Sequence, residues 1–144
     1  MDEINILLIE DNEGDIILTL EAFKQVGVKC NVEVLNDGEI ALQQFRKIRD
    51  AKIAIKPDLI LLDINLPKIN GIELLKIIKS DVDLVNIPVI VLTTSNSHQD
   101  IKDAYLNHAN SYMVKPMDLF VFNKQLKTLC EYWFKVIKLQ VEVV

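Results

Sequence analysis

Five polar residues follow apolar runs of the sequence in a way that could build one reactive site. Glu10 and Asp11 come directly after the first apolar run, and Asp63 directly follows the third. The fourth run ends at Thr93, and the fifth ends just before Lys115. If these runs are parallel strands, their carboxyl ends meet at one edge of a sheet, where open α/β folds bind ligands. The sequence therefore predicts three carboxylates, a hydroxyl and an ammonium at that edge.

These residue types favour phosphoryl chemistry around a metal ion. A single Asp after a strand is most often a cap or turn residue, so the combination carries the prediction. Carboxylates crowded into one crevice repel one another, which raises their pKa values or requires a cation. Such oxygen ligands suit Mg²⁺, beside which a carboxylate can attack phosphorus and form an acyl phosphate. The Thr93 hydroxyl and the Lys115 ammonium would oppose the charge of the transferred group.

Strand-like and helix-like segments alternate along the chain and would position these residues. The five apolar runs are rich in Ile, Val and Leu without polar alternation, as expected for strands covered on both faces. They span residues 4–9, 31–35, 59–62, 89–92 and 111–114. Between them apolar residues recur every three or four positions, and Gly27 stops the first such stretch. Five strand–helix units predict one doubly wound α/β domain with a five-stranded parallel sheet and helices on both faces.

Composition excludes several classes of protein. A formal net charge of -5, with no run of basic residues, argues against direct binding of nucleic acid. The acidic start lacks the features of a signal peptide, and no apolar run approaches the ~20 residues of a membrane span. We expect Cys30 and Cys130, both in apolar stretches, to be buried free thiols. Together these features predict a cytoplasmic protein without membrane insertion.

The polar constellation resembles the receiver domains of two-component response regulators, from residue 4 to about residue 134. Four stretches carry the resemblance, and each runs across the carboxyl end of a predicted strand. They are Ile-Leu-Leu-Ile-Glu10-Asp11-Asn12, Pro57-Asp58-Leu-Ile-Leu-Leu-Asp63-Ile-Asn-Leu-Pro67, Pro88-Val-Ile-Val-Leu-Thr93-Thr-Ser95 and Tyr112-Met-Val-Lys115-Pro116. The resemblance implies a flavodoxin-like strand order 2-1-3-4-5. It also implies a phosphorylation switch that receives its phosphoryl group from a sensor histidine kinase.

The resemblance further implies a role for each site residue. Asp63 would be phosphorylated, and Asp11 would bind Mg²⁺ directly while Glu10 acts through water. The backbone carbonyl of Asn65 would complete the metal shell. Phosphorylation would draw Thr93 toward the phosphoryl group, Tyr112 would swing inward behind it, and Lys115 would pair with the phosphate. The peptide bond before Pro116 would be cis.

A narrower resemblance concerns the partner. The longer connection from residue 49 to 57, the run Asp63-Ile-Asn-Leu-Pro-Lys68, the triplet Thr93-Thr-Ser95 and the ending Leu129-Cys-Glu-Tyr-Trp133-Phe134 are similar to stand-alone regulators of phytochrome-type sensor histidine kinases. We expect a receiver domain over residues 1–135 and a C-terminal extension over 136–144, with no separate output domain and no enzymatic output. The signal would then pass to a downstream protein through the surface of the domain.

Excess apolar surface near the C-terminus predicts a homodimer. The last helical segment carries apolar residues outside its inward stripe, and the tail then alternates apolar and polar residues, which is typical of an extended strand. A minority of these apolar residues would be exposed in any monomer. The predicted interface comprises Phe120, Tyr132, Phe134, Leu139, Val141 and Val143.

Three alternatives share parts of the pattern. A phosphatase of the haloacid dehalogenase type also uses a strand-end Asp and Mg²⁺, but it needs a second acid where this chain has Asn65. A nucleotide-binding fold needs a Gly-rich loop after the first strand, and none follows residue 9. A receiver-like scaffold without phosphorylation is disfavoured by the complete set of acids, Thr93 and Lys115.

Overall fold

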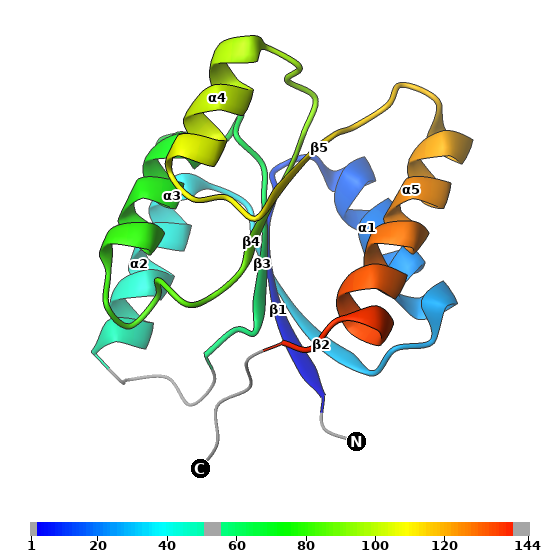
Figure 1. The fold of residues 1–144 in the computed structure, drawn as a ribbon, viewed down its shortest axis with the longest axis horizontal. Coiled ribbons are helices and arrows are strands. Elements are labelled where there is room, and N and C mark those ends of the chain that lie inside the picture. Colours follow the sequence, from blue (N-terminus) through cyan, green and yellow to red (C-terminus); the bar gives the residue numbers. More distant parts are fainter. Residues whose placement is uncertain (1–2, 51–55, 140–144) are drawn as a thin grey trace.

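The computed structural model describes residues 3–50 and 56–139, which form a twisted parallel sheet between two layers of helices (Figure 1). The strands lie in the order β2-β1-β3-β4-β5, and each neighbouring pair is parallel. They are β1 (Ile4–Ile9), β2 (Cys30–Leu35), β3 (Leu59–Leu62), β4 (Val89–Thr93) and β5 (Ser111–Val114). The predicted doubly wound α/β fold and its strand order are confirmed.

Each of the five α-helices in the described ranges begins after a residue whose side chain accepts a hydrogen bond from the first turn. The helices are α1 (Glu13–Val26), α2 (Gly38–Arg49), α3 (Gly71–Ser80), α4 (His98–Leu106) and α5 (Leu119–Glu131). Their N-caps are Asn12, Asp37, Asn70, Ser97 and Asp118, all residue types that satisfy free backbone N–H groups at a helix start. Gly27 ends α1 in the left-handed conformation at φ 76°, as its position in the sequence predicts.

The central strands are buried on both faces, which explains their lack of polar alternation. Leu7 and Ile9 of β1 face the cluster formed with α2, α3 and α4, whereas Ile6 and Leu8 face the cluster formed with α1 and α5. The residues of β3 divide between the two clusters in the same alternating way. Figure 1 shows the corresponding layers, with α1 and α5 on one side of the sheet and the other three helices opposite.

The last helix buries residues at intervals of four and then changes its winding. Phe122, Leu126 and Cys130 are buried, and the series continues to Phe134 in a π-helical turn, η1 (Tyr132–Val136). The ring of Phe134 packs edge-on against Phe23, with centroids 5.7 Å apart. The prediction that Phe134 lies at a dimer interface is therefore wrong, because the four-residue period turns this ring into the core of its own domain.

The other residues of the predicted interface differ in exposure. Phe120 is 79 % exposed and Tyr132 is 51 % exposed, so both are available at the surface. Leu139 is half-buried at the end of the described chain. Val141 and Val143 lie outside the described residues, and the proposal of a tail strand stays a prediction.

Candidate functional site

Three acids from two strands meet at the carboxyl edge of the sheet, as the sequence predicts. Ile9 and Leu62 are register partners in β1 and β3, so the next residues, Glu10 and Asp63, emerge side by side. The Asp63 N–H donates to the Ile9 carbonyl at 3.0 Å, which extends the strand pairing to the site. One carboxylate oxygen from each of Glu10, Asp11 and Asp63 lies within 4.8 Å of the others. Glu10 and Asp63 are buried, whereas Asp11 is exposed.

The backbone behind Asp63 packs against a glycine. A Cβ atom at Gly71 would lie 2.2 Å from the Asp63 carbonyl oxygen and 2.7 Å from the Cα of Ile64, closer than real atoms approach. The Gly71 N–H also donates to the Ile64 carbonyl at 2.9 Å. Only a residue without a side chain lets α3 begin at this distance from Asp63.

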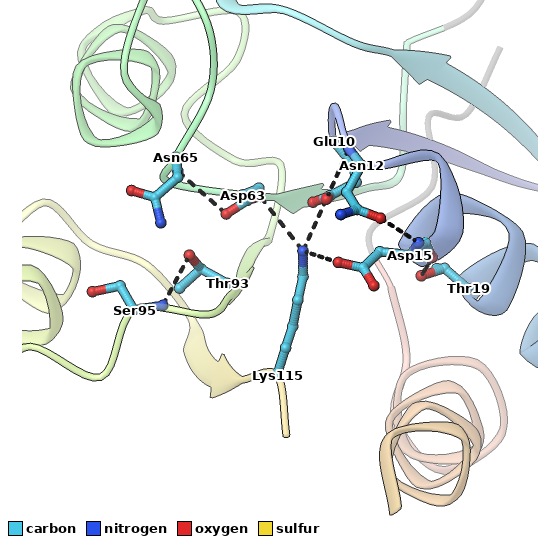
Figure 2. A network of polar contacts seen from close by, with 9 residues as sticks. All are labelled: Glu10, Asn12, Asp15, Thr19, Asp63, Asn65, Thr93, Ser95 and Lys115. Carbon is cyan, nitrogen blue, oxygen red and sulfur yellow. Dashed lines mark hydrogen bonds and ion pairs between the residues drawn. The ribbon is translucent and has the colours of Figure 1, made fainter. Parts of the chain in front are cut away.

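The Lys115 ammonium lies at the centre of the acids (Figure 2). Lys115 is buried and follows β5, where its backbone N–H donates to the Thr93 carbonyl at 2.7 Å. Its Nζ is 2.9 Å from Glu10 Oε1 and 3.5 Å from Asp63 Oδ2. A third carboxylate, that of Asp15, contacts the same Nζ at 2.9 Å. No pattern in the sequence predicts a role for Asp15, and the structure adds this residue to the site.

Thr93 and Tyr112 are joined through Ser95 on the opposite side of the site. Thr93 is fully buried at the end of β4, and its Oγ1 accepts a 3.4 Å hydrogen bond from the Ser95 N–H. The Tyr112 hydroxyl donates to the Ser95 carbonyl at 2.8 Å, and the Ser95 hydroxyl donates to Asp100 Oδ2 at 2.5 Å. The Asn65 N–H donates to Asp63 Oδ1 at 3.2 Å. The residues predicted for the metal and phosphoryl site therefore border one region.

The expected cis peptide before Pro116 is wrong for this structure, in which the Lys115–Pro116 bond is trans. The two isomers of a bond before proline differ by only ~0.5–1 kcal/mol in peptides, so local sequence does not fix the isomer. Lys115 reaches its three carboxylates with the bond in the trans form.

Burial governs the ionisation of Glu10. Removal from water raises its pKa from 4.5 to about 8; the hydrogen bond from Lys115 opposes this shift, and the negative charge of Asp63 adds to it. Burial alone lowers the pKa of Lys115, but the hydrogen bonds to Asp15 and Glu10 outweigh that effect and raise it. Lys115 is therefore a permanent cation, while Glu10 takes up a proton when no other positive charge is near.

We expect the metal-free protein to lose stability as the pH rises from about 4.5 to about 8. Between these values the folded chain binds more protons than the unfolded chain, because the pKa of Glu10 is higher in the folded state, and such a difference lowers the free energy of unfolding as pH rises. Lys115 keeps its charge over this range because its pKa lies above 10.5. Since one pKa unit corresponds to ~1.4 kcal/mol, the loss should amount to a few kcal/mol.

Denaturant titration in the presence of a chelator tests this expectation at both ends of that pH range. Glu10→Gln removes the titrating group, so the variant should be more stable than the wild type near pH 8 and should show a flatter dependence on pH. Parallel curves for the two proteins would contradict the assignment of the pH dependence to Glu10.

The donor set fits a hard divalent cation. Three carboxylates converge within reach of one ion, and Asp11 is open to solvent, which leaves room for water and phosphate oxygens in the shell. Oxygen donors, few protein ligands and retained water are the preferences of Mg²⁺. Mn²⁺ accepts the same carboxylate and water ligands.

Comparison with known proteins identifies the family. Residues 6–127 match the model of the response regulator receiver domain. The chain belongs to this family. It is 41 % identical over 128 residues to the probable methanogenesis regulatory protein FilR2 of Methanothrix harundinacea, a match that covers 89 % of this chain and 82 % of that protein. It is 36 % identical over 134 residues to the response regulator Rcp1 of Synechocystis, a match that covers 93 % of this chain and 91 % of Rcp1.

Solved structures agree with this assignment of the receiver domain. The Mn²⁺-bound form of Rcp1 superimposes with a TM-score of 0.90 at 35 % identity and covers 95 % of this chain and 99 % of that structure. The structure of the phosphorylated cyanobacterial phytochrome response regulator RcpA superimposes with a TM-score of 0.91 at 39 % identity. The match covers 97 % of this chain and 100 % of the RcpA chain.

Membership in this family settles the class of function. The receiver domain is a phosphorelay signalling switch of two-component systems, as the resemblance implied. The dehalogenase-type phosphatase and the nucleotide-binding fold are thereby set aside. In the part of the chain that the structure describes, no helix has the length and apolar character needed to cross a bilayer.

Proposed function

We propose that this receiver domain takes a phosphoryl group from a sensor histidine kinase onto Asp63, with Mg²⁺ as the cofactor. The observation that carries the proposal is the position of the Asp63 carboxylate. It lies within 4.8 Å of the carboxylate oxygens of Glu10 and Asp11 on one side and 3.5 Å from the Lys115 ammonium on the other. A carboxylate placed between a cation site and a fixed ammonium is suited to attack an anionic phosphoryl group.

The transfer requires one bond to form and one to break. A carboxylate oxygen of Asp63 bonds to phosphorus while the bond from phosphorus to the kinase histidine nitrogen breaks, and its electron pair returns to that nitrogen. Asp11, Glu10, Asp63 and the backbone carbonyl of Asn65 would hold Mg²⁺, with Asp11 as the direct carboxylate ligand and Glu10 acting through water. When bound, Mg²⁺ supplies positive charge that offsets the acids and the phosphoryl oxygens.

Thr93, Tyr112 and Lys115 would respond to the new group. Phosphorylation replaces the single negative charge of the Asp63 carboxylate by the roughly two negative charges of the phosphoryl group. Thr93 would hydrogen-bond a phosphoryl oxygen and Lys115 would pair with another. Because the Tyr112 hydroxyl and the Thr93 hydroxyl both contact Ser95, a movement of Thr93 would be felt by Tyr112 on the outer strand β5.

Incubation with Mg²⁺ and a small phosphodonor, followed by intact mass measurement, tests the proposal. We expect a gain of one phosphoryl group. A chain that keeps its unmodified mass would act as a receiver-like scaffold and would contradict the proposal.

The output and the partner form the second part of the proposal. Residues 1–135 would act as the switch and residues 136–144 as an extension, and the signal would pass to a downstream protein through surface contacts. A phytochrome-type kinase is favoured as donor by the similarity to RcpA over 97 % of this chain. We propose a cytoplasmic location, which the free thiols of Cys30 and Cys130 support.

We also propose a homodimer built on β5 and α5. β5 is the last strand in the sheet order, so its outer edge has no neighbouring strand among the described residues. A groove of about 730 Å³ runs between β5 and α5 and is lined by Met113, Leu129, Tyr132 and Trp133, among others. Phe120, in the first turn of α5, is also exposed. A stable interface buries roughly 1,000 Å² or more, which a helix face with a strand from the tail could provide.

Sedimentation should show the wild-type chain as a dimer at tens of micromolar. We expect the double substitution Phe120→Ser and Tyr132→Ser to raise the dissociation constant of the dimer about tenfold or more, because aromatic residues dominate the binding energy of such interfaces. Val82→Ser is the matched control, because Val82 is 85 % exposed and lies after α3. Phosphorylation should change the dimer's stability because Tyr112 lies on β5.

A chain ending at Lys135 tests the contribution of the extension. Loss of dimer stability in this shortened chain would support a tail strand. Wild type that stays monomeric in both phosphorylation states would contradict the dimer, and the apolar tail would then fold back on its own domain.

A further inference from the structure

Asp15 contacts Lys115 from a direction opposite to Asp63. Figure 2 shows the ammonium between the two carboxylates, with Asp15 on the first turn of α1. The Lys115 Nζ lies 2.9 Å from Asp15 Oδ2 but 3.5 Å from Asp63 Oδ2. Since strong N–H···O hydrogen bonds have lengths near 2.9 Å and weaken beyond about 3.2 Å, Lys115 is bound to Asp15 more tightly than to Asp63.

Asp15 is held in place for this contact. Its backbone N–H donates to the Asn12 side chain at 2.9 Å, and its carbonyl accepts from the Thr19 hydroxyl at 2.7 Å. Among the described residues its carboxylate accepts one hydrogen bond, from Lys115. The side chain of Asp15 is 21 % exposed and that of Lys115 is 4 % exposed, so water screens this pair only partly.

The ammonium has three N–H groups, and the three carboxylates use all of them. A phosphoryl group on Asp63 brings further oxygens to the same place and carries about two negative charges, in place of the single charge of the Asp63 carboxylate. The N–H that faces Asp63 at 3.5 Å can turn to one of those oxygens, but a second contact to them requires Lys115 to release Glu10 or Asp15. Glu10 is buried beside it, whereas Asp15 reaches solvent and is the partner that can be solvated after release.

We propose that Asp15 is a positioning residue that holds the Lys115 ammonium away from Asp63 in the unphosphorylated protein and thereby disfavours the phosphorylated state. The inference rests on the proposed phosphorylation of Asp63. It adds to that proposal a competing ligand that sets how much of the protein is phosphorylated at a given supply of phosphodonor and how long the phosphoryl group stays.

Asp15→Asn keeps the shape of the side chain and removes its charge. With a limiting small phosphodonor and Mg²⁺, we expect the ratio of phosphorylated to unphosphorylated protein to rise about threefold to tenfold, because a partly exposed ion pair is worth on the order of 1 kcal/mol. The phosphoaspartate should also last longer after the donor is removed. Intact mass measures both quantities.

Two further variants separate positioning from a general effect of charge. Glu13→Gln removes the same charge from the same turn of α1, but Glu13 is exposed and is not among the partners of Lys115, so the ratio should stay within twofold of the wild type. Asp15→Glu restores the charge and should also stay within twofold. An equal rise in all three variants would overturn the inference.

A metal-free measurement examines the contact itself. In protein labelled at lysine and kept in chelator, the side-chain NMR resonance of Lys115 should shift in Asp15→Asn and stay in place in Glu13→Gln. An unshifted resonance in Asp15→Asn, or a phosphorylation ratio within twofold of the wild type, would overturn the inference while leaving phosphorylation intact. A wild type that takes no phosphoryl group would instead contradict the proposed function itself.

Discussion

Asp63→Asn should abolish the gain of one phosphoryl group under conditions that label the wild type fully. The amide that replaces the carboxylate is a poor nucleophile toward phosphorus, and the described site has no other buried acid within 4.8 Å of both Glu10 and Asp11. The variant should fold, because the substitution keeps the size of the side chain and removes one of three mutually repelling charges. Intact mass after incubation with Mg²⁺ and a small phosphodonor measures the effect.

Asp58→Asn is the matched control for this substitution. Asp58 is also buried and also adjoins β3, but it precedes the strand and its Oδ2 accepts from the Asn5 N–H at 2.8 Å, at the end of the sheet away from the site. We expect this variant to be labelled like the wild type and to lose about 1 kcal/mol of stability. Full labelling of Asp63→Asn would disprove the assignment of the nucleophile.

Removal of Mg²⁺ should stop phosphotransfer, with a rate at least about 100-fold lower in chelator. Among the described residues a single ammonium, that of Lys115, faces the carboxylates of Glu10, Asp15 and Asp63. The site therefore cannot accept an anionic phosphoryl group without further positive charge. Transfer should return when Mg²⁺ is added back. Undiminished transfer in chelator would contradict a metal-dependent site.

Calorimetry of Mg²⁺ binding distinguishes the two acids after β1. Asp11 is exposed and free to bind the ion directly, whereas Glu10 is buried and already bonded to Lys115. We therefore expect Asp11→Asn to weaken Mg²⁺ binding more than Glu10→Gln. Equal affinities in the wild type and both variants would show that the ion binds elsewhere.

Much of the fold follows from local features of the sequence. The apolar runs give the strands to within one residue at either end, because burial on both faces leaves a continuous signal. Since parallel strands present their carboxyl ends at one edge of a sheet, the same runs also predict that Glu10, Asp63 and Lys115 lie close together. Local pattern and topology therefore sufficed for the acids and the ammonium.

Other features depend on contacts that local sequence does not encode. Asp15 and Lys115 are 100 residues apart, and on its own Asp15 is an ordinary acid in the first turn of a helix. Phe134 belongs to the core because a π-helical turn follows α5 and continues its series of buried residues. The sequence does not show where the helix changes its winding. The trans bond before Pro116 differs from the cis bond that the motif Lys115-Pro116 implied, because the local sequence leaves both isomers open.

The close packing of Gly71 against the Asp63 backbone bears on how loss-of-function variants should be interpreted. A methyl group at position 71 would push the first turn of α3 away from the strand end and displace the nucleophile without touching a polar atom. A genetic screen for silent signalling would thus recover Gly71 beside the acids, with the same phenotype and a different cause. A second substitution near α3 could restore signalling in a Gly71 variant, whereas no second substitution could replace the Asp63 carboxylate. Such a rescue would distinguish a structural defect from loss of the nucleophile.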